Sequence, residues 1–501
     1  MTAWLLRSLS RPSGTMLLLA GYFLLQWLLR ITMGPGFELD EAEQLLFGQR
    51  WQLGYSADPP LYTWLQIPLL RLFGDGAAAL ALLKNLLLFL TYACCWFIGR
   101  QAGLGVERAA LAALSLVLLP QIGWESQRDL THSVLVTTVS AASLWALLAL
   151  LNGRRGAGQY ALLGLLFGLG LLSKYNFAVF ILVAAIALAS LRPALVWRPA
   201  ALLTLLTCAL TVTPFLVWLS DNAALAASDA HRLGTGLSGY WAGVARGIVS
   251  LIESYAAFCG LLLLVLLLSF RPRGIVPAAA PPRTLAAQLL ARILWITLIV
   301  LILILFLTGG TEYRDRYLLP VLFFIPVVAL LRVPEQAFVR GRRAYLRWLL
   351  AAMLLIPLGL MARAHLIPLT GKPMKLTFPG PALARALAAD AGAPAYVIAN
   401  RSFIGGNLKP FIGAAFVGST QAQFPLRGMM EGRPQTVLLV WEPHRSDREF
   451  EKVKAYLQQQ LGPAVRPLSA RGSVSARHLN SEGEQVVLEW QLWERAPSAE
   501  K

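Results

Sequence analysis

Cysteine and histidine are both scarce in this chain of 501 residues, which has four Cys and five His. The Cys residues all fall inside apolar runs, at positions 94, 95, 208 and 259. This placement excludes a disulfide framework and a CxxC metal site. His132 and His231 are isolated and lack the spacing of metal ligands, so no obligatory metal is predicted. A divalent cation held by carboxylates is left open.

Phosphate loops, internal repeats and polar span centres are also missing. The GGNL sequence at 405–408 is too short to be a Gly-rich phosphate loop, and no cofactor is predicted. The centres of the apolar segments are almost purely Leu, Ala and Val, and no internal repeat is found. A transporter would place charged residues and broken helices at mid-membrane in repeated halves, so these absences argue against transport.

Charged side chains are few, whereas 57% of the residues are apolar and the mean hydropathy is +0.60. Runs of Leu, Ala and Val near twenty residues long recur through the chain, which excludes a soluble globule and predicts a polytopic α-helical membrane protein. The net charge of +18 does not indicate a nucleic-acid partner. The basic residues are spread over the loops between apolar segments and form no stripe with aromatic residues.

About eleven transmembrane helices are predicted. They cover residues 15–32, 77–98, 109–123, 130–151, 160–172, 177–191, 200–219, 255–270, 293–308, 317–331 and 346–361. The first run lacks a small-residue cleavage site and is therefore expected to be a retained helix, not a signal peptide.

The positive-inside rule gives the orientation. With a cytoplasmic N-terminus, the inner loops hold seventeen Arg and two acids, whereas the other side, up to residue 363, has eleven Lys or Arg and thirteen acids. Eleven spans then place the C-terminal region on the outer side, the same side as the first loop.

The predicted domain boundary lies at residue 363, where apolar runs shorten and charge rises. Residues 1–363 are assigned to the membrane domain and residues 364–501 to a small soluble α/β domain. Strand-like segments at 395–400, 435–441 and 486–493 alternate with helical segments such as 382–391 and 447–461.

The first outer loop, residues 33–66, carries five acidic residues between two apolar segments. Periodicity predicts an interfacial helix from Leu39 to Trp51, with its apolar side on the bilayer surface. Asp40 and Glu41 fall in its first turn, where the helix dipole favours carboxylates. They are either ordinary N-terminal helix acids or, because the chain first leaves the lipid here, functional groups.

Later outer loops add both acids and cations to the same membrane face. They contain Asp129 in a short loop, Lys174 in a Ser-Lys-Tyr turn, and the sequence GGTEYRDRYLLP at 309–320. A reaction on an anionic lipid-linked substrate requires a carboxylate to accept a proton and Arg or Lys to hold a phosphate.

The membrane region, about residues 15–365, resembles a bacterial member of the GT-C superfamily of polyprenyl-phosphate-sugar-dependent glycosyltransferases. It is most similar to the group that joins the protein mannosyltransferases, the aminoarabinose transferases of lipid A and the galacturonosyl transferases of lipopolysaccharide core. The resemblance rests on DEAE at 40–43, PPLYTWL at 59–65, RD at 128–129, GLGLLSKY at 168–175 and RDRYLLP at 314–320. Several relatives have Lys or Gln just before the Pro-Pro pair, where this chain has Asp58, so no phosphate or metal role is assigned there.

The resemblance implies an inverting glycosyl transfer at the outer face of the inner membrane. The donor is then a sugar on a polyprenyl phosphate such as undecaprenyl phosphate, and the acceptor is a lipid, a lipopolysaccharide or a protein. Asp40 is the implied base for the acceptor hydroxyl, and Glu41 and Asp129 are expected to assist. The sequence identifies neither the sugar nor the acceptor.

The remaining site residues are expected to bind the donor. Arg316 is the first choice for the donor phosphate, followed by Lys174, Arg314 and Lys84. Contacts with substrate are expected from three aromatic residues, Tyr62, Tyr175 and Tyr317.

Each assignment has a structural alternative. Asp129 can cap the helix that is predicted to start at Leu130. Lys174 and Lys84 can snorkel at a membrane boundary. Arg314 and Arg316 can be neutralised by Asp315 between them. A lipid or lipid-linked-sugar transporter or flippase without transferase chemistry is the alternative for the whole chain.

Overall fold

The structure is a computed structural model. It describes residues 2–56, 58–222, 239–270, 284–392, 394–422, 424, 426–429, 435–443, 448–462, 465–480 and 485–495. His231 lies outside the described residues. The chain forms two compact units. The bundle unit comprises Met1–Gln26, Ala57–Tyr62 and Lys84–Ile356, and the sheet unit comprises Trp27–Ser56, Thr63–Leu83 and Pro357–Lys501.

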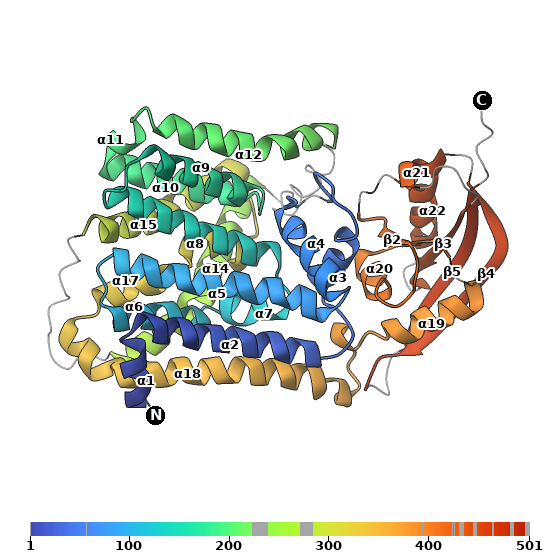
Figure 1. Ribbon diagram of the computed structural model, residues 1–501, viewed down its shortest axis with the longest axis horizontal. Helices are drawn as coiled ribbons and strands as arrows, with labels where there is room; N and C mark the ends of the chain where they lie inside the picture. The colour runs from blue at the N-terminus through green and yellow to red at the C-terminus, as the bar shows by residue number, and fades with distance from the viewer. Residues whose placement is uncertain are drawn as a thin grey trace. The chain divides into compact units, whose positions relative to one another are not determined.

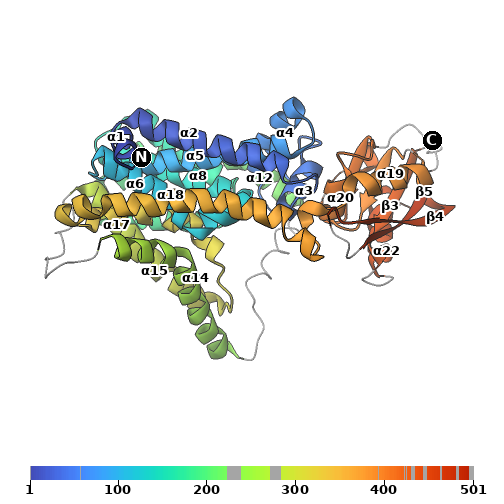
Figure 2. The same cartoon turned by 90° about the horizontal axis from the view of Figure 1, so that it is seen from below.

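The bundle unit is helical, and its helices α8, α9, α10 and α12 lie side by side (Figure 1). The helices that lie wholly within this unit are α1 (Thr2–Leu9), α6 (Val106–Leu114), α7 (Ser126–Arg128), α8 (His132–Leu151), α9 (Ala157–Leu171), α10 (Phe177–Leu191), α11 (Pro193–Val196), α12 (Ala201–Asp221), α14 (Tyr240–Ser269), α15 (Leu285–Thr308), α16 (Leu319–Leu322) and α17 (Ile325–Arg332). Four more helices contribute residues to both units: α2 (Pro12–Thr32), α4 (Leu61–Phe73), α5 (Ala77–Gln101) and α18 (Glu335–His365). In Figure 2, α14 and α15 project together from the other helices of the unit.

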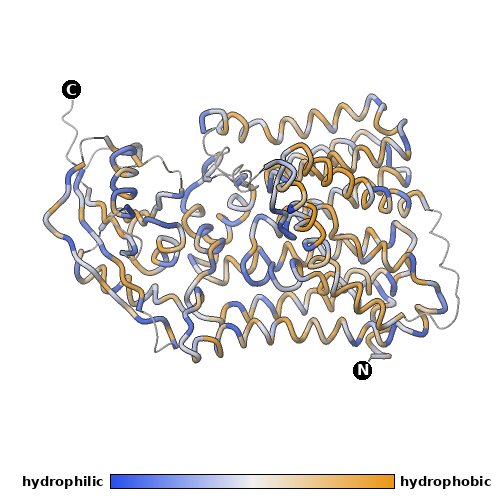
Figure 3. The backbone as a smooth tube through the Cα atoms, turned by 180° about the vertical axis from the view of Figure 1, so that it is seen from behind, coloured by the Kyte–Doolittle hydropathy of each residue, from blue (hydrophilic) through white to orange (hydrophobic). Residues whose placement is uncertain are grey.

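The protein is a polytopic α-helical membrane protein. Among the described residues, seven helices are long and apolar enough to cross a membrane: α2, α5, α8, α12, α14, α15 and the segment that begins with α18. Figure 3 shows mostly apolar residues along them. A bent pair, Val106–Leu118 with Gln121–Arg128, makes an eighth if it is counted as one span.

Three predicted spans correspond to shorter helices. Helices α9 and α10 have 15 residues each, or about 22 Å of helix, against a hydrocarbon core of about 30 Å. The span predicted at 317–331 is divided among a 3₁₀ turn (Asp315–Leu318), α16 and α17. The total of eleven spans stays a prediction.

The sheet unit contains the predicted α/β fold. Its strands are β1 (Tyr396–Ala399), β2 (Phe416–Ser419), β3 (Gln435–Trp441), β4 (Val465–Arg477) and β5 (Gln485–Arg495). They form one sheet in the order β2-β1-β3-β5-β4, in which β1 pairs in parallel with β2 and β3, and β5 runs antiparallel to β3 and β4.

Helices cover both faces of this sheet. They are α19 (Gly380–Ala391), α20 (Ser402–Leu408), α21 (Leu426–Met429) and α22 (Arg448–Leu461). Figure 2 shows α19 and α22 on opposite sides of the sheet. The core between the layers consists of apolar residues from β1 and β3 together with those helices, and hydrophobic burial of this kind is the main force that stabilises such a domain.

The first-loop helix belongs to the sheet unit, as α3 (Leu39–Phe47). The predicted end of this helix is wrong, and its interfacial placement stays a prediction. The helix ends at Phe47, so that Trp51 lies beyond it and is exposed. Of the predicted apolar face, Ala42, Leu45 and Leu46 are covered by protein and Leu39 is 41% exposed. Leu46 and Phe47 belong to the same core as the strands, and α20 packs against α3. The approach is so close that a Cβ on Gly406 would lie 2.0 Å from the carbonyl oxygen of Ala42.

Candidate active site

Asp40 lies in the first turn of α3, half-buried, where the positive end of the helix dipole favours a carboxylate. The turn is fixed by its neighbours on both sides. The backbone N–H of Glu38, which precedes the helix, donates to Glu41 Oε2 at 3.2 Å. The backbone that carries Asp40 is therefore held by the two acids that flank it.

Glu41 is a buried partner of Arg30. The Arg30 guanidinium donates from Nε to Glu41 Oε1 at 3.1 Å and from NH2 to Oε2 at 2.5 Å, and Glu41 is only 1% exposed. The same guanidinium donates to the carbonyl oxygen of Gly36 at 3.2 Å. This two-pronged geometry is the strongest form of carboxylate binding that Arg makes. The geometry of Glu41 fits a residue that positions the Asp40 turn, and its predicted assisting role stays a prediction.

Glu38 is a second buried acid at this helix, and it was not predicted. It is 0% exposed and receives the Arg363 guanidinium at 2.8 Å and the Lys375 ammonium at 3.3 Å. The two cations lie more than 300 residues away in the chain, so no local pattern marks them. Arg30 did carry a signal, because a charged residue near the end of an apolar span usually has a partner or a function.

In the bundle unit, a sharp break positions the second predicted acid. The chain bends by 74° between Leu118 and Gln121. Pro120 explains the break, because proline disfavours a helical conformation in the residue before it, and Leu119 is indeed extended. A π-helical turn, Gln121–Glu125, follows the bend, and a Cβ on Gly123 would lie 2.3 Å from the carbonyl oxygen of Val117.

Asp129 comes directly after this bent segment. Helix α8 begins at His132 rather than at Leu130, and its N-cap residue is Thr131, two residues after Asp129. The Lys84 ammonium donates to the backbone oxygen of Asp129 at 3.4 Å, and Lys84 is only 2% exposed. Burial to this degree is incompatible with snorkelling, which keeps the ammonium in water.

Lys174 and Tyr62 contact the first residues of α8. The Lys174 ammonium donates to Ser133 Oγ at 2.8 Å, and the Tyr62 ring lies 5.6 Å from the His132 ring. Three predicted residues, Tyr62, Lys84 and Lys174, therefore gather around Asp129 and the start of α8. Tyr175 has a different neighbour, since its ring stacks on Phe215 of α12 at 6.4 Å.

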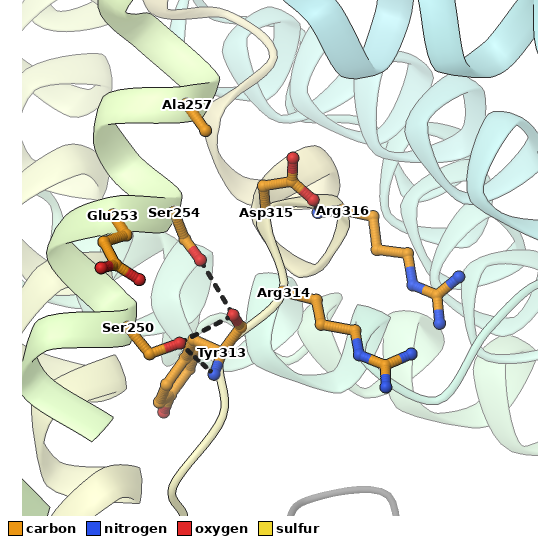
Figure 4. Close-up of a pocket in the computed structure, with 8 residues that line it drawn as sticks. All are labelled: Ser250, Glu253, Ser254, Ala257, Tyr313, Arg314, Asp315 and Arg316. Carbon is orange, nitrogen blue, oxygen red and sulfur yellow. Dashed lines mark hydrogen bonds between the residues drawn. The ribbon is translucent and has the colours of Figure 1, made fainter. Parts of the chain in front are cut away.

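The loop with the two predicted arginines is anchored on both sides, and Figure 4 shows its hydrogen bonds to α14. Ser250 and Ser254 of α14 each donate to the backbone oxygen of Tyr313 at 3.0 Å, and the Tyr313 N–H donates to Ser250 Oγ at 2.9 Å. On the other side, Gln121 from the bent segment donates to Asp315 Oδ2 at 2.6 Å. Burial raises the pKa of Tyr313 to about 12, so its hydroxyl remains a neutral donor to the Leu301 carbonyl.

Asp315 makes its hydrogen bonds to other groups than the flanking guanidinium groups. Its Oδ2 accepts from Gln121 and its Oδ1 accepts from the backbone N–H of Arg316 at 2.7 Å. Within the part of the chain that the structure describes, no ion pair joins Arg314 or Arg316 to a carboxylate. The alternative of a loop neutralised by Asp315 therefore has no contact ion pair to support it.

Arg316 and Tyr317 lie at the junction of this loop with the turn after α9. The Arg316 guanidinium lies 5.9 Å from the Tyr317 ring, at the outer limit of a cation–π contact. Asn176 donates to the backbone oxygen of Tyr317 at 3.5 Å. The Lys174–Asn176 turn and the arginine loop are thus neighbours in the bundle unit.

No cluster of three or more His, Cys, Asp or Glu side chains suited to a metal ion occurs among the residues described by the structure. The bundle unit carries the predicted phosphate-binding cations Lys84, Lys174, Arg314 and Arg316. The sheet unit carries the predicted base, Asp40. The roles of all these residues stay predictions.

Comparisons with known proteins agree with the resemblance. Residues 57–218 match the family model described as dolichyl-phosphate-mannose-protein mannosyltransferase. The lipopolysaccharide core galacturonosyltransferase RgtA of Rhizobium johnstonii is 35% identical over 409 residues, which is 78% of this chain and 79% of that protein. This chain belongs to the family of GT-C glycosyltransferases that includes RgtA. RgtB of the same organism, another lipopolysaccharide core galacturonosyltransferase, is 31% identical over 89% of this chain and 91% of its own length.

The protein is therefore a membrane glycosyltransferase, and the transporter alternative is set aside. The fold agrees as well. The crystal structure of ArnT from Cupriavidus metallidurans bound to undecaprenyl phosphate aligns with a TM-score of 0.60, covering 97% of this chain and 99% of that chain at 14% identity. At that identity the likeness establishes a GT-C fold and no more.

Proposed function

We propose that this glycosyltransferase moves a galacturonosyl residue from a polyprenyl-phosphate donor to the core of lipopolysaccharide. The observation that carries the proposal is the 35% identity to RgtA, whose name gives both the sugar and the acceptor. The polyprenyl-phosphate donor is supported by the GT-C fold shared with ArnT, which was crystallised with undecaprenyl phosphate.

The proposed reaction is a single displacement. The acceptor hydroxyl oxygen attacks the anomeric carbon, the bond from that carbon to the phosphate oxygen breaks, and the polyprenyl phosphate leaves with the electron pair. Asp40 takes the hydroxyl proton, and Asp129 assists. One displacement inverts the anomeric configuration.

The proposed binding partners of the donor phosphate are the cations of the bundle unit. Arg316 is the first candidate because the adjacent carboxylate of Asp315 is already engaged by Gln121. Lys174 is the second, and its hydrogen bond to Ser133 supports a fixed position for the ammonium. Lys84 and Arg314 complete the predicted set, and Tyr62, Tyr175 and Tyr317 are the proposed aromatic contacts.

The proposed location is the bacterial inner membrane, with a cytoplasmic N-terminus, transfer at the periplasmic face and a periplasmic C-terminal region. Periplasmic activity of a reporter enzyme fused after Lys501 is the expected result. A cytoplasmic signal from that fusion would contradict both the eleven-span topology and the face of transfer.

Reconstitution tests the reaction itself. Purified full-length protein is mixed with undecaprenyl-phosphate-linked galacturonate and lipopolysaccharide that lacks the core uronate. Mass spectrometry should show one uronate gained by the acceptor and free polyprenyl phosphate released, and NMR should show the anomeric configuration opposite to that of the donor. Movement of unaltered donor across vesicles, with no product, would instead identify a flippase.

A further inference from the structure

Two arginines of the loop, Arg314 and Arg316, line a single cavity. A pocket of about 400 Å³ lies beside the loop and is lined by Ser250, Glu253, Ser254, Ala257, Tyr313, Arg314, Asp315 and Arg316. Its size falls in the range of about 300–1,000 Å³ that is usual for small-ligand sites. Figure 4 shows the Arg314 and Arg316 side chains extending in the same direction, away from α14.

The two guanidinium groups have no direct carboxylate partner. Two acids, Glu253 and Asp315, line the same pocket, so its formal charges balance. The oxygens of Asp315 accept hydrogen bonds from Gln121 and from the backbone N–H of Arg316, and no ion pair joins Arg314 or Arg316 to a carboxylate among the described residues. Two guanidinium groups without an ion-pair partner at one pocket suit a ligand that carries two anionic groups.

The two arginines differ in their surroundings. Arg316 is half-buried, and its Nε is a buried donor with no acceptor among the described residues. An unmatched buried donor costs about 1–3 kcal/mol, so this position demands a strong acceptor such as a phosphate oxygen. Arg314 is exposed at the same pocket, with its fork accessible to a second, planar anion.

We infer that Arg314 determines donor specificity by binding the carboxylate of a uronic acid, while Arg316 binds the lipid phosphate. The inference rests on the proposed function and gives the two arginines separate tasks. A uronate on a polyprenyl phosphate has a carboxylate at one end of the sugar and a phosphate at the other. Carboxylate is the group that the planar guanidinium fork matches best. The neutral hexose has a hydroxymethyl group in its place and leaves Arg314 without a counter-charge.

The test compares two donor lipids that differ only at this group. Purified full-length protein is given galacturonate or galactose on the same polyprenyl phosphate, and the ratio of the two kcat/KM values is measured. Wild type should favour the uronate. Arg314→Ala should lower that ratio roughly ten- to hundredfold, because a site built for a polar group discriminates through the pairing it loses. Arg314→Lys, which keeps the charge without the fork, should fall between the two.

A second readout separates the two arginines. Binding of sugar-free polyprenyl phosphate should be weakened by Arg316→Ala far more than by Arg314→Ala. Arg246→Ala removes an exposed arginine from α14 outside the pocket and should leave the donor ratio and lipid binding at wild-type values.

Three results would overturn the inference. These are an equal loss for both donors in Arg314→Ala, a wild type that does not distinguish the donors, and loss of sugar-free lipid binding in Arg314→Ala. In all three cases the wild-type protein still transfers sugar. Failure of the proposed function looks different, because wild type would then transfer neither sugar. Arg314→Lys keeps the test decisive if Arg314→Ala does not fold.

Discussion

The acids around α3 and the arginines of the Tyr313–Tyr317 loop are opposite solutions to the placement of charge. Glu38 and Glu41 are buried and matched by Arg, Lys and backbone donors from their own unit. Arg314 and Arg316 line a pocket, and the acid between them is engaged elsewhere. Charge that is satisfied internally holds the fold, whereas charge that is left for a ligand creates affinity. The predictions below test this division.

The largest expected effect is at Asp40, the acid next to the buried pair. Asp40→Asn keeps the size of the side chain but cannot accept a proton, so transfer should fall about 10²–10⁴-fold, the usual contribution of a general base. The measurement is kcat of purified protein, with unfolding temperature as the folding check. Asp390→Asn, an exposed acid at the end of α19, is the matched control and should have no effect. Near-normal turnover in Asp40→Asn would assign the base to another residue, with Asp129 the next to test.

Removal of one member of a buried pair should instead act on stability. Glu41→Gln leaves the buried Arg30 guanidinium without its ion-pair partner, and breaking a buried pair in this way typically costs about 3–5 kcal/mol. A lower unfolding temperature in detergent is the expected result. The double variant Arg30→Met/Glu41→Leu removes both charges and should recover much of that loss. If Glu41→Gln is as stable as wild type and loses only turnover, Glu41 acts in the reaction together with Asp40. The assignment of Glu41 to the charges that stabilise the fold would then be wrong.

Loss of Arg316, which lines the pocket, should weaken lipid binding and leave the unfolding temperature unchanged. Arg316→Ala should weaken binding of sugar-free polyprenyl phosphate roughly ten- to hundredfold, since a hydrogen bond to a charged group is worth about 1.5–3 kcal/mol. Arg316→Lys should be intermediate because it lacks the planar fork. Arg246→Ala serves again as the control. Unchanged lipid binding in Arg316→Ala, measured by a fluorescence or calorimetric titration, would make the loop structural.

The smallest effect is expected at Lys174, which combines features of the charges paired inside the protein and of those left for a ligand. Its ammonium already has one partner, Ser133 Oγ, and can keep it while binding a phosphate. Lys174→Met should weaken lipid binding about tenfold or less, and Ser133→Ala should have a smaller effect, since it removes one neutral partner. If Lys174→Met lowers the unfolding temperature but leaves lipid binding unchanged, Lys174 belongs with the internally satisfied charges.

Sequence patterns predicted the membrane class and much of the sheet unit. The predicted strand at 435–441 matches β3, and the predicted segments at 395–400 and 486–493 lie within about a residue of β1 and β5 or inside them. β2 and β4 were missed. β2 is four residues long and includes Gly418, and β4 is polar with Pro467, Gly472 and a register shift. Neither offers the alternation of apolar residues on which strand prediction depends.

The sequence of α3 did not show whether its apolar face packs on lipid or on protein. Periodicity gave an apolar face of Leu39, Ala42, Leu45, Leu46 and Trp51. Ala42, Leu45 and Leu46 are buried, whereas Leu39 and Trp51 are exposed. A lipid surface and a protein core select the same apolar pattern, so the pattern alone cannot distinguish them. Glu38 was missed for a related reason, because its Arg363 partner is 325 residues away. The helix break at Pro120 could have been predicted, because a proline inside an apolar run often interrupts a helix.

The close packing of α3 on α20 also determines when this part of the protein can fold during synthesis. The backbone N–H of Phe37 donates to Asn407 Oδ1 across 370 residues of chain, and Gly406 makes the contact with Ala42 possible. At about 5–20 residues per second, the ribosome needs roughly 20–75 s to make that intervening chain. During this interval the turn that carries Asp40 has been made but its supporting helix has not, and the apolar face of α3 needs shelter, which a lipid surface provides. A nascent chain halted before residue 402 should therefore be inserted in the membrane while α3 still lacks the cover that α20 provides.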